Sequence, residues 1–294
     1  AAAHAERIAI PSDSPSLDHM LDAEIADWSA AASRHARTPL FWGNLVAGAH
    51  QVGFRRETSS ELVVDLWYPA EHVQQPPLTF GDYIRLSEDL RGAEAAGSGS
   101  DDAVRRTIAT AMTGDPEGVA PGLLAVIADA RMAARRNAPS AHGRFPLVIW
   151  TPRYATTAAQ AVLSEYLASR GYVVAFARQR TRAARLPFEL PSADAKAAEL
   201  AKNVEDMRSA VRFLDGRREV DASAIGVLAW SYTGEMATAF QLIEPRVRLV
   251  AGLSTTLVND WVFRPAEAPA SLDASRMPAL YAGVNPQGGA AGSP

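Results

Sequence analysis

A serine at the junction between an apolar run and a helical pattern is the residue of this sequence best placed to do chemistry. The run from Ile225 to Trp230 is apolar and stops at Ser231, and a helical pattern with Met236 and Phe240 on one side follows at once. This pattern indicates a buried parallel strand that feeds a helix through a tight turn. Such a turn exposes the serine hydroxyl at the carboxyl end of the strand, beside the first amides of the helix. An exposed hydroxyl next to amide donors can perform nucleophilic acyl transfer.

The residues around Ser231 meet the steric requirement of such a turn only in part. Because the serine is held in a strained backbone conformation, the positions two before and two after it must be small, which gives the G-x-S-x-G pattern. These positions hold Ala229 and Thr233, with Gly234 one residue further on. Alanine fits with little penalty, whereas β-branched threonine fits less well. The motif therefore leaves two interpretations, a nucleophile at the turn or a serine that caps the following helix.

Composition limits the classes of protein to which this chain can belong. Its 294 residues, 48% of them hydrophobic, can form one parallel α/β domain with additions. The net charge of −4 and the scattered basic residues give no indication of nucleic-acid binding, and no apolar run is long enough to cross a bilayer. The absence of cysteine excludes disulfides, thiolate metal sites and a cysteine nucleophile. Because no metal constellation and no nucleotide-binding glycine loop is present, we expect no cofactor.

The first residues, A-A-A-H-A-E-R, are typical of the small-residue region at a signal-peptidase cleavage site. We therefore expect a secreted or periplasmic protein. A chain shortened at its N-terminus for another reason would begin with the same residues, so a cytoplasmic location stays open. No pattern in the sequence indicates an oligomeric state.

The hydrophobic patterns divide the chain into an N-terminal arm, residues 1–49, and one domain, residues 50–294. The arm is alanine-rich and predicts one helix over residues 18–33. Residues 51–69 alternate as two strands and predict an antiparallel pair at the edge of the main sheet. Residues 76–143 show helical patterns and no strands of their own. This helical insertion is predicted to be either a lid over an active site or a helical layer packed at the side of the sheet.

From residue 145 onward, strand and helix patterns alternate. Buried strands are predicted at residues 145–151, 172–177 and 277–283, an arginine-rich loop at 178–185, and an amphipathic helix at 194–214. This alternation implies parallel strands joined by right-handed crossovers, with functional sites at the carboxyl ends of the strands. The predicted fold class is therefore α/β.

The order of these elements resembles the α/β-hydrolase fold, most closely the branch of dienelactone hydrolase and type II platelet-activating-factor acetylhydrolase. The segments that carry the resemblance are V-D-L-W-Y-P-A at 64–70, F-P-L-V-I-W-T-P at 145–152, L-A-S-R-G-Y-V-V-A at 167–175, V-D-A-S-A-I-G-V-L-A-W-S-Y-T-G at 220–234 and P-R-V-R-L-V-A-G-L-S at 245–254. The resemblance extends over residues 51–283 and implies a mostly parallel sheet with helices on both faces.

The resemblance also implies roles for individual residues. Ser231 matches the nucleophile, and Tyr232 directly after it would give one amide of the oxyanion hole. The second amide would come from Arg153, where relatives usually carry His-Gly or Pro-Gly. The Arg153 guanidinium is either a ligand for a substrate carboxylate or phosphate, or a solvated side chain. Asp260 lies where some relatives place the catalytic acid, and a helix cap is the alternative role for it.

The histidines depart from the family pattern, in which the base follows the nucleophile in the chain. All six precede Ser231, and they are His4, His19, His35, His50, His72 and His142. The linker-like C-terminal residues supply neither the last strand of the fold nor the histidine that follows it. Either the chain is cut or diverged before that segment, or it is a relative that has lost it. His142, just before a core strand, is a conceivable non-standard base and also a plausible surface residue.

Two functions follow from these patterns. The first is a serine hydrolase that cleaves small-molecule carboxylic esters through an acyl-enzyme on Ser231. The second is a catalytically incomplete hydrolase-fold protein that acts as a binding module, which the missing histidine and Thr233 favour.

Overall fold

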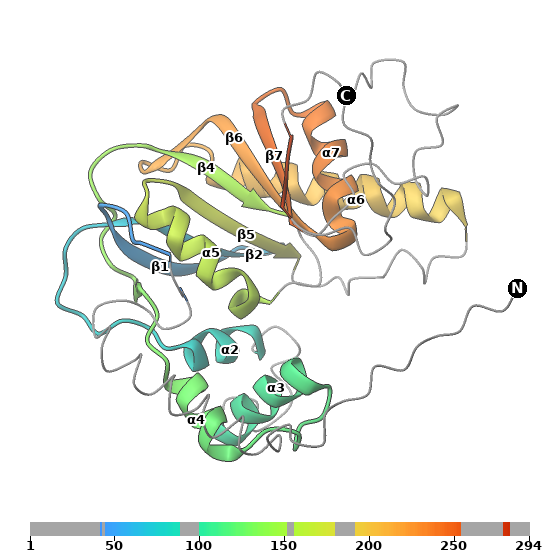
Figure 1. Ribbon diagram of the computed structural model, residues 1–294. Coiled ribbons are helices and arrows are strands. Elements are labelled where there is room, and N and C mark those ends of the chain that lie inside the picture. The colour runs from blue at the N-terminus through green and yellow to red at the C-terminus, as the bar shows by residue number, and fades with distance from the viewer. Residues whose placement is uncertain are drawn as a thin grey trace, which may run out of the picture.

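A computed structural model gives the structure of the protein (Figure 1). The residues that it describes are 42, 45–88, 100–151, 156–179, 192–253 and 279–282. In these residues the strands are β1 (Gln51–Thr58), β2 (Leu62–Ala70), β3 (Ala134–Arg136), β4 (Phe145–Trp150), β5 (Val173–Gln179), β6 (Val220–Trp230), β7 (Val247–Leu253) and β8 (Ala279–Ala282). The helices are α2 (Phe80–Glu88), α3 (Asp101–Thr113), α4 (Pro121–Asp129), α5 (Thr157–Ser169), α6 (Ala193–Leu214) and α7 (Gly234–Ile243).

The described strands form one sheet in the order β3-β1-β2-β5-β4-β6-β7-β8. Strands β5, β4, β6, β7 and β8 run parallel to one another, whereas β2 is antiparallel to both β1 and β5. The mostly parallel sheet predicted from the alternating pattern is therefore confirmed. Its parallel part brings the carboxyl ends of β4, β5, β6 and β7 to a single edge, where α/β proteins place their sites.

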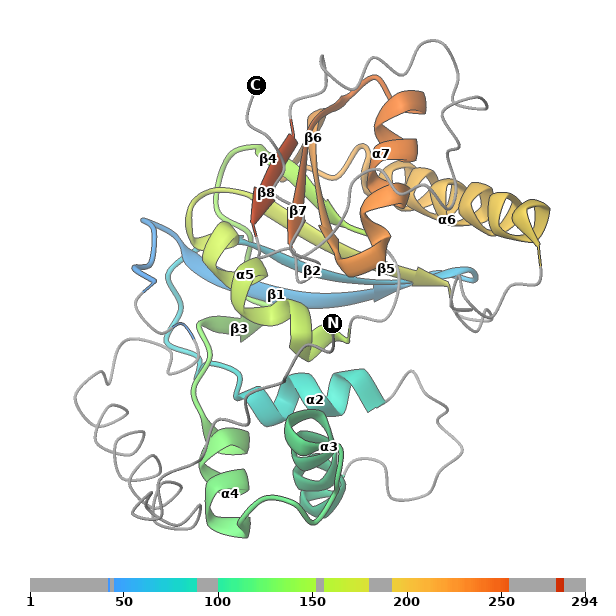
Figure 2. The same ribbon diagram turned by 45° about the vertical axis from the view of Figure 1, so that its right-hand side comes forward.

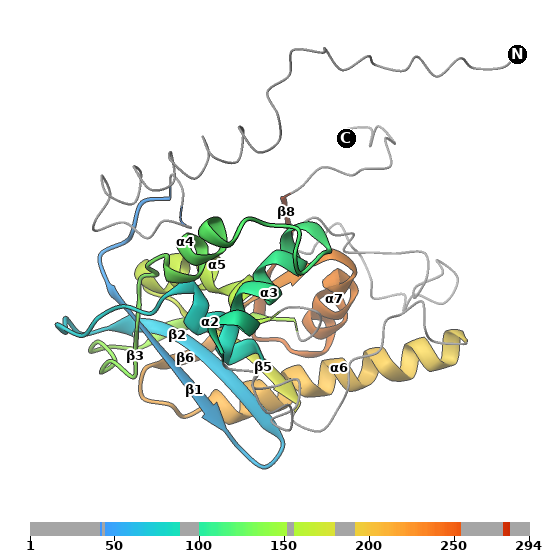
Figure 3. The same cartoon turned by 90° about the horizontal axis from the view of Figure 1, so that it is seen from below.

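Helices cover both faces of the sheet because alternate residues of each strand point to opposite sides. On β4, Leu147 and Ile149 pack in a core with residues of α6 and α7, whereas Val148 and Trp150 pack in a second core with residues of α5. Figure 3 shows α5 on one side of the strands and α6 on the other. The predicted two-sided helical cover is confirmed.

The position of the β1–β2 pair differs from the prediction. The two strands are antiparallel as expected, but β2 lies between β1 and β5, and β1 is itself paired with β3 through the register Val52↔Ala134. Every residue of β2 is buried. The pair lies at one end of the sheet, but it is not the edge itself, because β3 pairs outside β1. Asp65 made one face of β2 look solvated, whereas this carboxylate is buried between Arg56 of β1 and Arg178 of β5.

The helical insertion, residues 76–143, packs beside α5. Helices α2, α3 and α4 contribute to the same core as α5, and Figure 2 shows them gathered on that side of the sheet. The expectation that the insertion contains no strand was wrong, because its last part forms β3. The backbone of Leu78 bonds to that of Ala134 and of Met132, each at 2.8 Å, so the two ends of the insertion run side by side. A role as a lid stays a prediction.

The N-terminal arm is described at Trp42 and from residue 45 onward, and the helix predicted over residues 18–33 lies outside the described residues. The Trp42 side chain is buried and its ring packs edge-on against Tyr166 of α5. Within the part of the chain that the structure describes, no helix combines the length and the apolarity that a membrane crossing requires.

One buried carboxylate joins four of these segments. Glu165 of α5 accepts hydrogen bonds from Trp42 Nε1 at 3.0 Å, Tyr83 Oη at 2.8 Å, Ala133 N at 2.8 Å and Ala134 N at 2.9 Å. Burial raises the pKa of Glu165, and the four donors limit the rise because they stabilise the charged form. Both carboxylate oxygens are therefore occupied by donors from the N-terminal arm, α2 and the start of β3.

We expect Glu165→Gln to destabilise the protein by about 3 kcal/mol, because one oxygen becomes an amide NH₂ that faces two buried donors and leaves them unpaired. Urea unfolding followed by circular dichroism measures the change. Glu205→Gln on the exposed face of α6, where the carboxylate pairs only with surface arginines, is the matched control and should stay within about 0.5 kcal/mol of wild type. Equal losses in the two variants would contradict the role given to Glu165.

Candidate active site

Ser231 occupies a strained turn at the carboxyl end of β6. Strand β6 ends at Trp230, a single 3-10 turn spans Ser231–Thr233, and α7 begins at Gly234. Among the described non-glycine residues, only Ser231 and Asn137 have positive φ angles, 55° and 56°. The left-handed conformation costs an L-residue roughly 1–2 kcal/mol, so the surrounding structure must impose it. Ser231 is solvent-exposed, and the predicted strand–turn–helix junction is present.

Thr233 closes this turn, which explains why a β-branched residue can stand where glycine is usual. Its side chain is buried, and its hydroxyl accepts a hydrogen bond from Trp230 N at 3.0 Å and donates to Trp230 O at 2.8 Å. The hydroxyl also lies 2.6 Å from the Thr151 hydroxyl at the end of β4. Since Thr233 uses its proton on the carbonyl, Thr151 is the donor of this third bond. The threonine thus ties the turn to the neighbouring strand.

The other predicted site residues are described only in part. Tyr232 is the second residue of the 3-10 turn. Backbone amides in the first turn of a helical segment have no partner within the helix, so the Tyr232 amide is placed to donate to a ligand. The Gly234 amide is already bonded to Ser231 O. Arg153, the predicted second oxyanion donor, and Asp260, the predicted acid, both lie outside the described residues.

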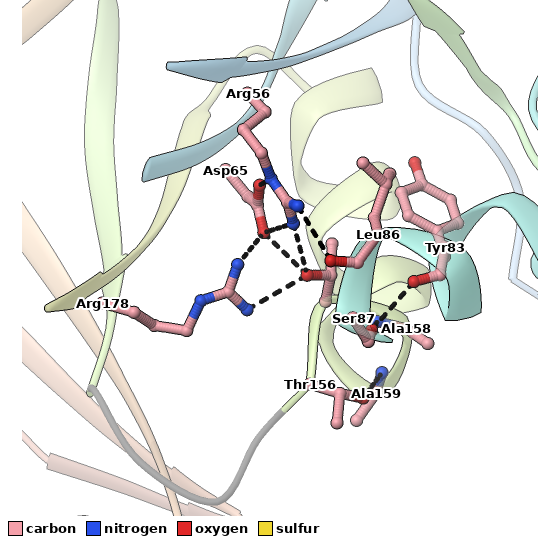
Figure 4. Close-up of polar contacts among 10 residues, drawn as sticks. Arg56, Asp65, Tyr83, Leu86, Ser87, Thr156, Ala158, Ala159 and Arg178 are labelled. Atoms are coloured by element: carbon pink, nitrogen blue, oxygen red, sulfur yellow. Dashed lines mark hydrogen bonds and ion pairs between the residues drawn. The ribbon is translucent and has the colours of Figure 1, made fainter. Parts of the chain in front are cut away.

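A cluster that the sequence did not predict surrounds Asp65 at the same edge of the sheet (Figure 4). Arg56 of β1 binds Asp65 with Nε and one terminal nitrogen, at 2.6 and 3.0 Å, and Arg178 of β5 binds it at 2.7 Å. The Thr157 hydroxyl at the start of α5 donates to the same carboxylate at 2.7 Å. Burial lowers the pKa of Arg178 to about 10, and the charge of Arg56 adds to this effect. Arg178 therefore remains charged at neutral pH.

This cluster fixes the start of α5, which directly follows the segment in which Arg153 lies. Arg56 reaches further, to the carbonyl of Leu86 in α2 at 2.8 Å, and Arg178 donates to the Thr157 hydroxyl at 3.1 Å. Thr156 caps α5 by accepting from Ala159 N at 3.2 Å. Arg178 was predicted in a loop but belongs to β5. The signal in the sequence that could have revealed the arginine cluster is Asp65, the one charged residue in the otherwise apolar β2.

The described histidines lie at the opposite edge of the sheet from Ser231. His142 precedes β4, has a side chain that is 91% exposed and sits 3.5 Å from Glu71. His50 precedes β1, and His72 follows β2, so both lie at the amino ends of the parallel strands. The structure therefore does not bring His142 to Ser231. No group of three or more histidine, aspartate or glutamate side chains that could hold a metal ion occurs among the described residues.

Comparison with known proteins shows the fold. No family model and no curated protein matches the sequence. Among solved structures, the ferulic acid esterase from Streptomyces cinnamoneus is similar with a TM-score of 0.51 and 21% identity, over 81% of this chain and 66% of that one. Esterase B from Lactobacillus rhamnosis, whose structure concerns inhibition by a tributyrin phosphonate, matches with a TM-score of 0.34 and 16% identity, over 82% of this chain and 60% of that one.

The present chain thus spans 66% or less of the length of these two esterases. The sheet order, the helices on both faces and the likeness to the ferulic acid esterase show that the protein has the α/β-hydrolase fold. The finer likeness to the dienelactone hydrolase branch stays a prediction.

The backbone of Ser231 predicts an order of stability among its variants. We expect Ser231→Gly to be about 1 kcal/mol more stable than Ser231→Ala, because glycine removes the left-handed strain and loses only part of that gain to its greater freedom in the unfolded chain. Chemical unfolding of the two variants measures the difference. A glycine variant no more stable than the alanine variant would contradict the strained turn.

The bonds of Thr233 predict a second effect. Thr233→Val keeps the shape of the side chain but leaves Trp230 N and the Thr151 hydroxyl without their buried partner, which should cost about 2 kcal/mol. Thr233→Ser keeps the hydroxyl and should cost less than about 1 kcal/mol. Thermal and urea unfolding compare the two, and a serine variant as unstable as the valine variant would show that the methyl group, not the hydroxyl, matters.

Proposed function

We propose that the protein is a serine hydrolase that cleaves carboxylic esters, with Ser231 as the nucleophile. The observation that carries this proposal is the exposed, left-handed Ser231 at the carboxyl end of the central strand β6. A structural serine or an ordinary helix cap needs no such conformation, since N-cap residues adopt extended backbone angles. The strain is the kind that proteins retain where a reacting group must be lifted from the sheet.

The reaction would proceed in two steps. The Ser231 oxygen attacks the ester carbonyl carbon, its proton passes to a base, and the backbone amides of Tyr232 and Arg153 donate to the developing oxyanion. The carbonyl re-forms as the C–O bond to the alcohol breaks, and the alcohol leaves with a proton. Water then attacks the acyl-enzyme in the same way and releases the carboxylic acid. The base is none of His50, His72 and His142, and Asp260 is retained as the proposed acid.

The surroundings of Ser231 support an ester with an apolar or aromatic portion. Trp230, directly before Ser231, is 49% exposed, and Leu253 lies beside it in the register of β7. An exposed indole next to a nucleophile offers a flat apolar surface on which an acyl group can stack. The similar fold of the ferulic acid esterase supports aromatic acyl esters as the first substrates to test.

A binding module without turnover is the second candidate. The observation that favours it is the placement of the three described histidines at the far edge of the sheet, because an acyl-transferring serine needs a base within hydrogen-bond reach. In this case esters would bind beside Ser231 but would not be cleaved.

Labelling with a fluorophosphonate probe separates these functions. We expect the folded wild-type protein to form an adduct on Ser231, identified by peptide mass spectrometry, and to hydrolyse 4-nitrophenyl esters. Ser231→Ala should lose the adduct and at least about 1,000-fold in kcat. Ser223→Ala, an exposed serine near the other end of β6, is the matched control and should behave as wild type.

Two results would contradict the ester hydrolase. One is a folded wild-type protein without an adduct on Ser231, and the other is turnover that survives Ser231→Ala. Saturable ester binding that persists in Ser231→Ala without turnover in either protein would establish the binding module instead.

A further inference from the structure

A row of apolar residues runs along one face of β6 and β7 and starts beside Ser231. Alternate residues of a strand share a face, and the register of the two strands pairs Trp230 with Leu253 and Gly226 with Leu249. Two of the large side chains are open to solvent, Trp230 at 49% and Leu249 at 43%. We call this row the apolar strip, and its members are Trp230, Leu228, Gly226, Leu253, Ala251 and Leu249.

The helices that pack against β6 and β7 lie on the opposite face of these strands. Helices α6 and α7 pack against β6, and α7 also packs against β7, as Figure 1 shows. Their contacts belong to the core that contains Val227 and Val250, whose side chains point away from the apolar strip. Helix α5 covers the strip side of the sheet, but it packs against β1, β2 and β5. Among the described helices, none therefore packs closely over β7 on the strip side.

Gly226 leaves space above the backbone of the central strand. It is partly exposed although β6 lies in the interior of the sheet, between β4 and β7. Its neighbours in register are Val148 of β4 and Leu249 of β7. A Cβ atom added to Gly226 would meet Val148 at 3.4 Å and would not come within 4 Å of Leu249. The strip therefore has room for a chain that lies along the sheet between these two side chains.

The position of Ser231 indicates what the apolar strip binds. An ester within reach of the Ser231 oxygen must extend its acyl group over a neighbouring surface, and the adjoining Trp230 offers an exposed apolar one. The side chains of the strip carry no charge and only one polar group, the Trp230 indole N–H, so hydrocarbon is the group that gains most from them. From Trp230 to the level of Gly226 the strand rises by about 13 Å. An extended chain of about ten carbon atoms has this length.

We propose that the apolar strip binds the acyl chain of the ester, so that the substrates are esters of linear aliphatic acids of about eight to ten carbons. The chain leaves Ser231 over Trp230 and reaches Gly226 and Leu249. An aromatic acyl group would contact only the Trp230 end of the strip. The inference rests on the function proposed for Ser231, and it adds Leu249 as a residue that determines specificity.

The 4-nitrophenyl esters of butyric, hexanoic, octanoic and decanoic acid, assayed below the concentrations at which they form micelles, test the strip through kcat/KM. Each methylene group that moves from water onto the strip should raise kcat/KM by about twofold, because the strip covers only one side of the chain and gives about half the free energy of full burial. We therefore expect the octanoate ester to have a kcat/KM at least about tenfold above that of the butyrate ester.

Variants of Leu249 locate the chain on the strip. Leu249→Gln places an amide there and should lower the ratio of kcat/KM for octanoate over butyrate by about fivefold or more. Ile243→Gln is the matched control, because Ile243 is 49% exposed at the end of α7 and lies outside the strip. It should leave the ratio unchanged. If Leu249→Gln does not fold, Leu249→Ala takes its place and should lower the ratio by about threefold.

A binding measurement separates this inference from the ester hydrolase. Isothermal titration of sodium octanoate into the Ser231→Ala protein needs no turnover, and we expect saturable binding that a second change, Leu249→Gln, weakens and Ile243→Gln does not. This result in a protein that cleaves no ester would support the strip and count against the hydrolase.

Three results would overturn the inference. One is equal kcat/KM for all four esters in a protein that forms the Ser231 adduct, which leaves the hydrolase intact. Another is the absence of saturable octanoate binding, or equal weakening by Leu249→Gln and Ile243→Gln. The third is a dimer in sedimentation velocity that Leu249→Gln dissociates, because a second copy of the chain would then cover the strip.

Discussion

The four hydrogen bonds accepted by the buried Glu165 carboxylate are the interaction on which the arrangement around α5 depends. A buried charge is tolerated only where hydrogen bonds replace its lost hydration, and Glu165 has four such bonds. Its donors come from segments as far as 123 residues away along the chain. The N-terminal arm, α2 and β3 therefore share one anchor on α5.

Asp65 plays the corresponding part at the other edge. It joins β1, β2, β5 and the first residue of α5 through two arginines and Thr157. Helix α5 is thus held near its start by one buried carboxylate and, further along, by another. The first anchor fixes the start of α5 at the carboxyl ends of the parallel strands, and the second fixes a residue near the end of the same helix.

The sequence patterns predicted the secondary structure that depends on residues close to one another in the chain. The amphipathic period predicted residues 194–214 as a helix, observed as Ala193–Leu214, and the apolar run ending at Ser231 predicted a strand, turn and helix that the structure contains. The interior position of β2 and the strand character of Arg178 were not predictable in this way. Asp65 and Arg178 are 113 residues apart, and neither residue alone indicates that the other neutralises it. The role of Thr233 also escaped prediction, because it needs Thr151 from another strand.

The paired ends of the insertion have a consequence for how this protein can change. Leu78 and Ala134 are hydrogen-bonded neighbours although 76–143 forms a long excursion from the sheet. Closing a loop costs entropy that grows only with the logarithm of its length, so the exposed connection between α3 and α4 can be lengthened at little thermodynamic cost. Strands β1, β2 and β4 would keep their register throughout. Divergence among proteins of this architecture should therefore be concentrated in that connection, leaving the sheet intact.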